Sequence, residues 1–193
     1  DWQLIEGMGD QLWFVTNKGA PKLKVVKVDL SGADAVFSDI IAERSEPLAR
    51  AQIVGSRLVL SYLKDAASLA EMVSLDGKPL QRIQLNSIGT ASGFSGKPGD
   101  PETFYSFSSF NQPGAIYRFD STTGKSSVFA QPKLSFEPAS ISIEQRFYAS
   151  KDGTKVPMFV VRKKDIDLSK GAPTLLYAYG GFNLPQLPSF SAT

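Results

Sequence analysis

The hydrophobic and polar positions of the chain repeat over three stretches of about 45 residues. Each stretch holds a run of alternating apolar residues, a polar loop, a second such run and a turn that contains an aspartate. These aspartates are Asp29, Asp76 and Asp120, which lie 47 and 44 residues apart. Strands and polar turns at a period in the forties predict the blades of a β-propeller. Closed propellers typically have about 4–8 blades, so three repeats indicate part of one.

Each repeat is expected to contain four strands. A short outer strand follows each aspartate turn, and a further strand candidate precedes the first apolar run, most clearly at residues 51–54. The other predicted strands are 12–16, 24–28, 58–62, 70–75, 79–85, 103–107, 115–119 and 126–130.

The repeat stops at a proline-rich junction between Gln131 and Pro138, where we place a domain boundary. Residues 1–132 form the predicted propeller part and residues 133–193 a second domain. The second part begins with alternating runs on either side of Asp152-Gly153, which predicts a β-hairpin. The unbroken apolar run at 174–179 then predicts a strand buried on both faces, ended by two glycines. The tail from Asn183 to Phe190 is extended by its prolines and is expected to lack a surface to pack on.

Composition excludes several classes of function. The chain of 193 residues is globular in composition, with 42% hydrophobic and 21% charged residues. Its net charge of +2 is too small to suggest nucleic-acid or membrane-surface partners, and no apolar run approaches membrane-spanning length. The chain begins abruptly at Asp1-Trp2, so a preceding leader is compatible with the sequence.

The chain has no histidine and no cysteine, which is its most restrictive feature. Zinc and haem sites of the usual kinds are excluded, and neither a metal nor a cofactor is predicted. A Ser-His-Asp triad cannot be built from this chain. Residues 93–97 fall one residue short of a G-x-S-x-G elbow and are predicted to be a glycine-rich blade loop. The basic run 162–164 is expected to be a solvated strand end, and Asp165 with Asp167 a polar connector.

A specific resemblance extends these patterns. The string FYASKDGTKVPMFVV (147–161), followed by PTLLYAYGGFN (173–183), closely resembles the start of the catalytic domain in prolyl oligopeptidases. The order of propeller and hydrolase-like strands resembles that family as well. The resemblance implies a mainly β chain: about three blades of a seven-bladed propeller, followed by the first strands of an α/β-hydrolase domain.

The same resemblance implies a function for the parent protein. It would be a serine endopeptidase that cleaves short peptides on the C-terminal side of proline. This chain would be inactive alone, because the catalytic Ser, Asp and His would lie outside it. Its expected partners are short proline-containing peptides and the remainder of the same polypeptide. The expected location is the cytoplasm, with the periplasm as the alternative.

Two residues match functional positions of the family. Tyr179 matches the tyrosine whose hydroxyl helps to form the oxyanion hole, and Phe182 matches a residue that lines the pocket for the substrate's proline. Tyr177 is expected to be structural. A rival interpretation from another class remains open: a non-catalytic β-propeller module that binds protein. An elbow serine flanked by glycines in the reading frame beyond Thr193, with Asp and His later, would decide for the enzyme.

Overall fold

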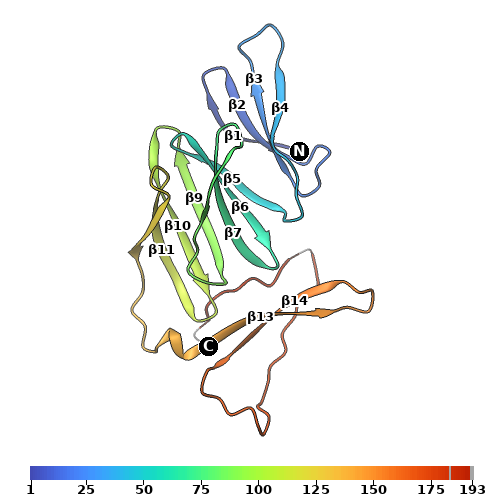
Figure 1. Ribbon diagram of the computed structural model, residues 1–193, viewed down its shortest axis with the longest axis vertical. Helices are drawn as coiled ribbons and strands as arrows, with labels where there is room; N and C mark the ends of the chain where they lie inside the picture. The colour runs from blue at the N-terminus through green and yellow to red at the C-terminus, as the bar shows by residue number, and fades with distance from the viewer. Residues whose placement is uncertain (183, 192–193) are drawn as a thin grey trace.

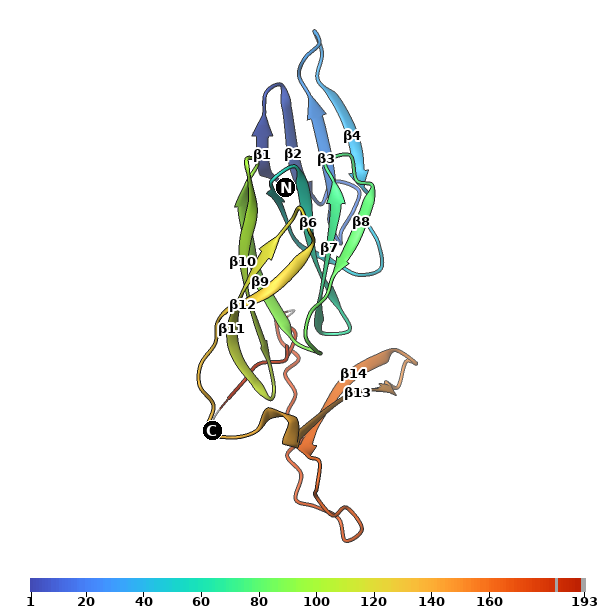
Figure 2. The same ribbon diagram turned by 60° about the vertical axis from the view of Figure 1, so that its left-hand side comes forward.

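The computed structural model describes residues 1–182 and 184–191, and the regular secondary structure of this part of the chain consists almost entirely of antiparallel strands (Figures 1 and 2). Three four-stranded sheets follow one another, and a two-stranded hairpin comes after them. The prediction of a mainly β chain with three strand repeats is confirmed. The first sheet holds β1 (Trp2–Met8), β2 (Gln11–Thr16), β3 (Lys24–Asp29) and β4 (Val36–Ile41). The second holds β5 (Leu48–Val54), β6 (Arg57–Lys64), β7 (Ala67–Ser74) and β8 (Pro79–Ile83). The third holds β9 (Thr90–Lys97), β10 (Asp100–Ser109), β11 (Gln112–Asp120) and β12 (Lys125–Ala130).

Each sheet is an up-and-down meander whose strands pair in chain order, as the blade of a propeller does. The sheets stack face to face in the order of the chain (Figure 2). One apolar cluster fills the space between the first two blades and another the space between the second and third. The first cluster includes Trp13, Val25, Ile53, Leu58 and Leu60; the second includes Val59, Phe94, Tyr105, Phe107, Tyr117 and Phe119.

The aspartate turn of a blade rests on the blade before it. The turn after β7 contacts the first blade through an ion pair of 2.8 Å between Lys27 Nζ and Asp76 Oδ1. The indole N–H of Trp13 donates to the carbonyl of Leu75 in the same turn, at 3.0 Å. The turn after β11 meets the second blade in the same way, because the side-chain amide of Gln81 donates to the Gly124 carbonyl at 2.7 Å. The repeated turn is therefore a repeated inter-blade contact.

The expectation of a glycine-rich loop at residues 93–97 was wrong, because these residues belong to β9. The pairing of β9 with β10 slips beside Gly93, which has φ +117°. Such a β-bulge re-aims the neighbouring side chain. Phe94 consequently points into the core, where its ring stacks on Tyr105 with the centroids 4.5 Å apart.

The chain then crosses to η1 (Pro138–Ser140), β13 (Ile141–Ala149) and β14 (Lys155–Lys163). The predicted hairpin is confirmed: Ala149 pairs with Lys155, and Gly153 takes the turn with φ +83°. Figures 1 and 2 show this hairpin beyond one end of the three blades. Its side chains are only partly buried, because the hairpin packs lightly against the blades.

The predicted buried strand at 174–179 was wrong. These residues form no strand, and Leu175 and Leu176 are 90% and 81% exposed. A strand buried on both faces needs paired neighbours and covering layers. No strand of the described residues pairs with this segment, so its apolar side chains face solvent.

Candidate functional site

The segment that leads to the predicted site residues starts with two tight turns after β14. The amide of Ser169 donates to Asp167 Oδ1 at 2.9 Å, and Gly171 N donates to the Leu168 carbonyl at 3.2 Å. The bond from Ser169 lowers the pKa of the Asp167 carboxyl. The chain then runs without regular structure to the two glycines. Tyr177, which is expected to be structural, is 71% exposed.

Tyr179 lies over the glycine pair that follows it. A side chain at position 181 would begin 3.0 Å from the Tyr179 hydroxyl, so glycine is what lets the phenol lie across the backbone. The Tyr179 side chain is 46% exposed, and its hydroxyl makes no hydrogen bond to another described residue. Within residues 1–182 and 184–191, the phenol therefore presents a hydrogen-bond donor without a protein acceptor.

Phe182 follows in a left-handed backbone conformation with φ +56°. A positive φ is uncommon for a bulky residue, and such conformations concentrate at functional sites. The turn is closed by Leu184 N, which donates to the Gly181 carbonyl at 3.2 Å. The Phe182 ring is 90% exposed. The structure thus brings Tyr179 and Phe182 together on one turn, with both aromatic side chains open to solvent.

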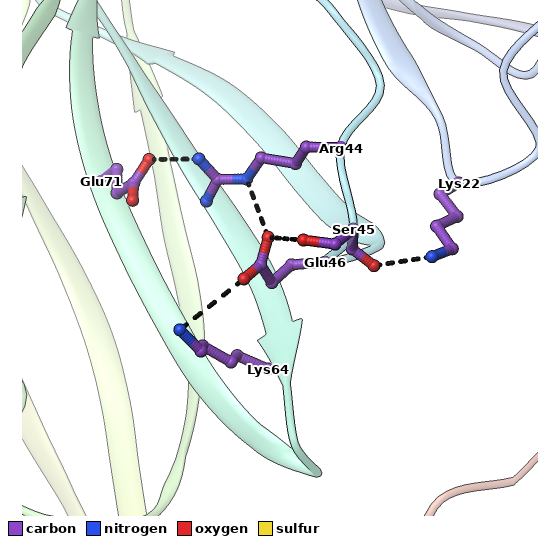
Figure 3. A network of polar contacts seen from close by, with 6 residues as sticks. All are labelled: Lys22, Arg44, Ser45, Glu46, Lys64 and Glu71. Atoms are coloured by element: carbon purple, nitrogen blue, oxygen red, sulfur yellow. Dashed lines mark hydrogen bonds and ion pairs between the residues drawn. The ribbon is translucent and has the colours of Figure 1, made fainter. Parts of the chain in front are cut away.

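A network of charged groups lies where the first blade joins the second, and the sequence did not point to it (Figure 3). Arg44, between β4 and β5, reaches Glu71 on β7 with an N–O distance of 3.0 Å and Glu46 at 3.7 Å. Glu46 in turn meets Lys64 at 3.7 Å. Lys22 of the first blade donates to the Ser45 carbonyl at 2.8 Å. In the sequence, this network is marked only by the adjacent charged residues of the string Arg-Ser-Glu at 44–46. Their partners are 18 to 27 residues away, so the pairing could not be inferred from the sequence.

The Arg44 guanidinium also lies over the Tyr62 ring, 3.5 Å from its centroid. Burial opposes the charge on Arg44, but the hydrogen bond to Glu71 and the nearby charges outweigh it and raise the pKa of the guanidinium. Burial disfavours the charged phenolate and therefore raises the pKa of the Tyr62 phenol. A cavity of about 540 Å³ adjoins these groups. The Ser45 hydroxyl of the network donates to Glu46 Oε2 at 2.7 Å. The pKa of that carboxyl is lowered, by this bond first and also by Arg44 and Lys64, which makes it a weak base. The geometry therefore suits a cross-link between blades rather than chemistry.

A second cavity, of about 890 Å³, lies between the end of the third blade and residues 131–139. Its polar wall is made of side-chain amides. Asn86 and Gln112 both donate to the Tyr117 hydroxyl, the latter at 3.1 Å, and Asn111 donates to the Pro138 carbonyl at 3.0 Å. The bond from Asn111 ties the junction to the blade.

Within residues 1–182 and 184–191, no group of three or more carboxylates, histidines or cysteines is placed to hold a metal ion. In the same part of the chain, no helix is long and apolar enough to cross a membrane.

The fold and the site define a partial β-propeller that continues into a hairpin and a solvent-exposed aromatic turn. Residues 1–132 match the family model described as the prolyl oligopeptidase N-terminal β-propeller domain. The chain belongs to this family.

Named relatives agree with the family model. The chain is 39% identical to a prolyl endopeptidase of Elizabethkingia miricola over 189 residues, which is 97% of this chain and 27% of that protein. A solved structure from a study of two prolyl endopeptidases matches with TM-score 0.85 and 50% identity, over 99% of this chain and 28% of that chain. Prolyl oligopeptidase B from Galerina marginata matches with TM-score 0.87 and 32% identity, over 99% and 28%. The chain thus spans little more than a quarter of these relatives.

Proposed function

We propose that this chain is the end of the propeller and the start of the peptidase domain of a prolyl oligopeptidase. The parent protein is a serine endopeptidase that cleaves short peptides after proline through an acyl-enzyme. The observation that carries the proposal is the similarity to named prolyl endopeptidases over nearly the whole chain, which includes the aromatic turn at 179–182. The domain boundary falls near residue 132 in this proposal.

Tyr179 supplies a hydrogen-bond donor to the oxyanion. Attack on the scissile carbonyl creates a negative oxygen, and donors aimed at that oxygen stabilise the transition state. A phenol held over a Gly-Gly turn, with no hydrogen-bond partner among the described residues, can turn toward that charge without first breaking another bond. A structural tyrosine would instead be buried and bonded to a carbonyl.

Phe182 forms one wall of the pocket for the substrate's proline. The pyrrolidine ring is apolar and compact, so an aromatic face packs well against it. A ring that is 90% exposed has apolar surface left to cover, and a bound proline would cover it. Prolyl oligopeptidase B of G. marginata has been solved with a 35mer hydrolysis and macrocyclization substrate bound. Short proline-containing peptides are the proposed substrates here.

The test compares this chain with the full-length product of its reading frame. Both are incubated with chromogenic peptides that end in proline or alanine, and with a serine-directed phosphonate probe. The proposal expects the full-length protein to cleave after proline and to be labelled, whereas residues 1–193 alone do neither, because the chain has no histidine to complete a triad. A full-length protein that binds other proteins but neither cleaves nor labels would favour the non-catalytic propeller module.

A further inference from the structure

The tail of the chain is seated on the end of the third blade, although the sequence predicted that it would have no surface to pack on. The Thr90 hydroxyl of β9 donates to the Pro188 carbonyl at 2.7 Å. The amide of Phe190 donates to the Ser108 hydroxyl of β10 at 3.2 Å. Pro188 is buried. Asn183, the first residue of the predicted tail, lies outside the described residues, so this correction concerns residues 184–190.

The two hydroxyls form a prearranged pair. Thr90 and Ser108 are direct partners across β9 and β10, so both side chains lie on the same face. The Ser108 hydroxyl donates to the Gln112 carbonyl at 3.2 Å, which leaves its oxygen free to accept from Phe190. We call Thr90 and Ser108, with the residues that they hold, the tail clamp.

An aromatic stack completes the tail clamp. The Phe190 ring lies parallel to that of Phe136, with an interplanar angle of 2° and centroids 5.9 Å apart. Phe136 belongs to the junction between the third blade and η1. The tail therefore contacts both the third blade and the strand connection that leaves it.

The segment between β14 and the tail is consequently held at both of its ends. Upstream, the hairpin contacts the blades through Phe159, whose ring lies 5.4 Å from that of Phe110, and through Gln145, which donates to the Asp65 carbonyl at 2.5 Å. Downstream, the tail clamp begins six residues after Phe182. Six residues span at most about 22 Å even when fully extended. A segment fixed at both ends has less freedom than one fixed at a single end.

We propose that Thr90 and Ser108 are positioning residues, which hold Tyr179 and Phe182 in place relative to the propeller through residues 184–190. The inference rests on the proposed function. The tail clamp consists of two ordinary hydrogen bonds and one ring stack, so it opens easily, and its closed state sets how often the aromatic turn is correctly placed. Removal of both hydroxyl groups should raise the open population about tenfold.

The first experiment measures the tail clamp directly in the full-length protein. The variant Thr90→Val with Ser108→Ala keeps the side-chain shapes and removes both hydrogen bonds to the tail. The matched control is Ser92→Ala with Ser106→Ala, a neighbouring hydroxyl pair on the same strands, 2.8 Å apart, that does not bond to the tail. Hydrogen exchange at Phe190 should be about tenfold faster in the clamp variant only. Equal exchange in the two variants would overturn the tail clamp.

The second experiment asks whether the clamp positions the site. The clamp variant should lower kcat/KM on a proline peptide in proportion to the loss of the closed state, by at most about tenfold. Tyr179→Phe should then cost less in that background than in the wild type, because the hydroxyl is already misplaced. In the control background, Tyr179→Phe should lower kcat/KM by the same factor as in the wild type. Faster exchange at Phe190 with unchanged kinetics would overturn the positioning role alone. A wild-type protein without prolyl peptidase activity would overturn the proposed function, and the positioning role with it.

Discussion

Replacement of Tyr179 by phenylalanine in the full-length enzyme separates a catalytic role from a structural one. The change keeps the ring and removes only the hydroxyl. That hydroxyl lies over Gly181, on a side chain that is 46% exposed, and bonds to no other described residue. The structure therefore predicts almost no loss of stability, within about 0.5 kcal/mol, as for other surface substitutions.

The expected loss in catalysis is far larger. A donor to the oxyanion acts mainly in the transition state, so its removal lowers kcat and leaves substrate binding nearly unchanged. Loss of one such donor typically costs about 10²–10³ in kcat, or about 3–4 kcal/mol. The two predicted magnitudes differ enough that one variant decides between the roles.

The assay measures kcat and KM on a chromogenic proline peptide, together with a thermal melt of the same preparation. Tyr177→Phe is the matched control, because this tyrosine is two residues away, is also exposed and has no proposed role. It should leave both kcat and the melting temperature unchanged. A Tyr179→Phe enzyme with normal kcat would refute the oxyanion assignment, whatever its stability.

Three further outcomes follow from the fold. Trp13→Phe should lower the free energy of unfolding by about 2–4 kcal/mol in a denaturant titration, because it opens space between two blades and removes the hydrogen bond to the partly buried Leu75 carbonyl; an unchanged midpoint would contradict this contact. The hydrogen bond and charge of Lys27 lower the pKa of Asp76 below its usual value of about 3.9. Its stabilisation is therefore present above that pH and lost as the pH falls through the lowered pKa, and Asp76→Asn should remove this part of the acid sensitivity. Limited proteolysis of the isolated chain should cut first within 164–182, which forms no strand; first cuts inside the blades would be inconsistent with the packing.

The blades could be predicted because each obeys a local rule. Alternating side chains and polar turns specify a strand meander without reference to distant residues, and the outer strands followed from the same period. β9 was missed because Gly93 and Gly96 suggested a loop, whereas the bulge at Gly93 serves to aim Phe94 into the core. Glycine indicates unusual backbone, and only packing decides whether that backbone is a turn or a bulge.

The rest depended on contacts between distant residues. The run 174–179 has the composition of a buried strand, but burial requires partner strands, which the described residues do not supply. The tail clamp joins Thr90 to Pro188, 98 positions away, and no local pattern marks either residue. Tyr179 and Phe182 were selected by resemblance to a family, since two aromatic residues beside glycines do not by themselves define a site.

The contacts that the second and third aspartate turns make with the preceding blade have a consequence for how the array opens. The second blade is bonded to both of its neighbours. Its own aspartate turn contacts Trp13 and Lys27 of the first blade, and Gln81 on its outer strand β8 bonds to the turn of the third blade that contains Gly124. In an array with nearest-neighbour coupling, a middle unit can open only by giving up two interfaces, whereas an end unit gives up one. Amide protons of β6 and β7 should therefore be the last to exchange. A destabilising substitution in the second blade should speed hydrogen exchange in both the first and the third blade.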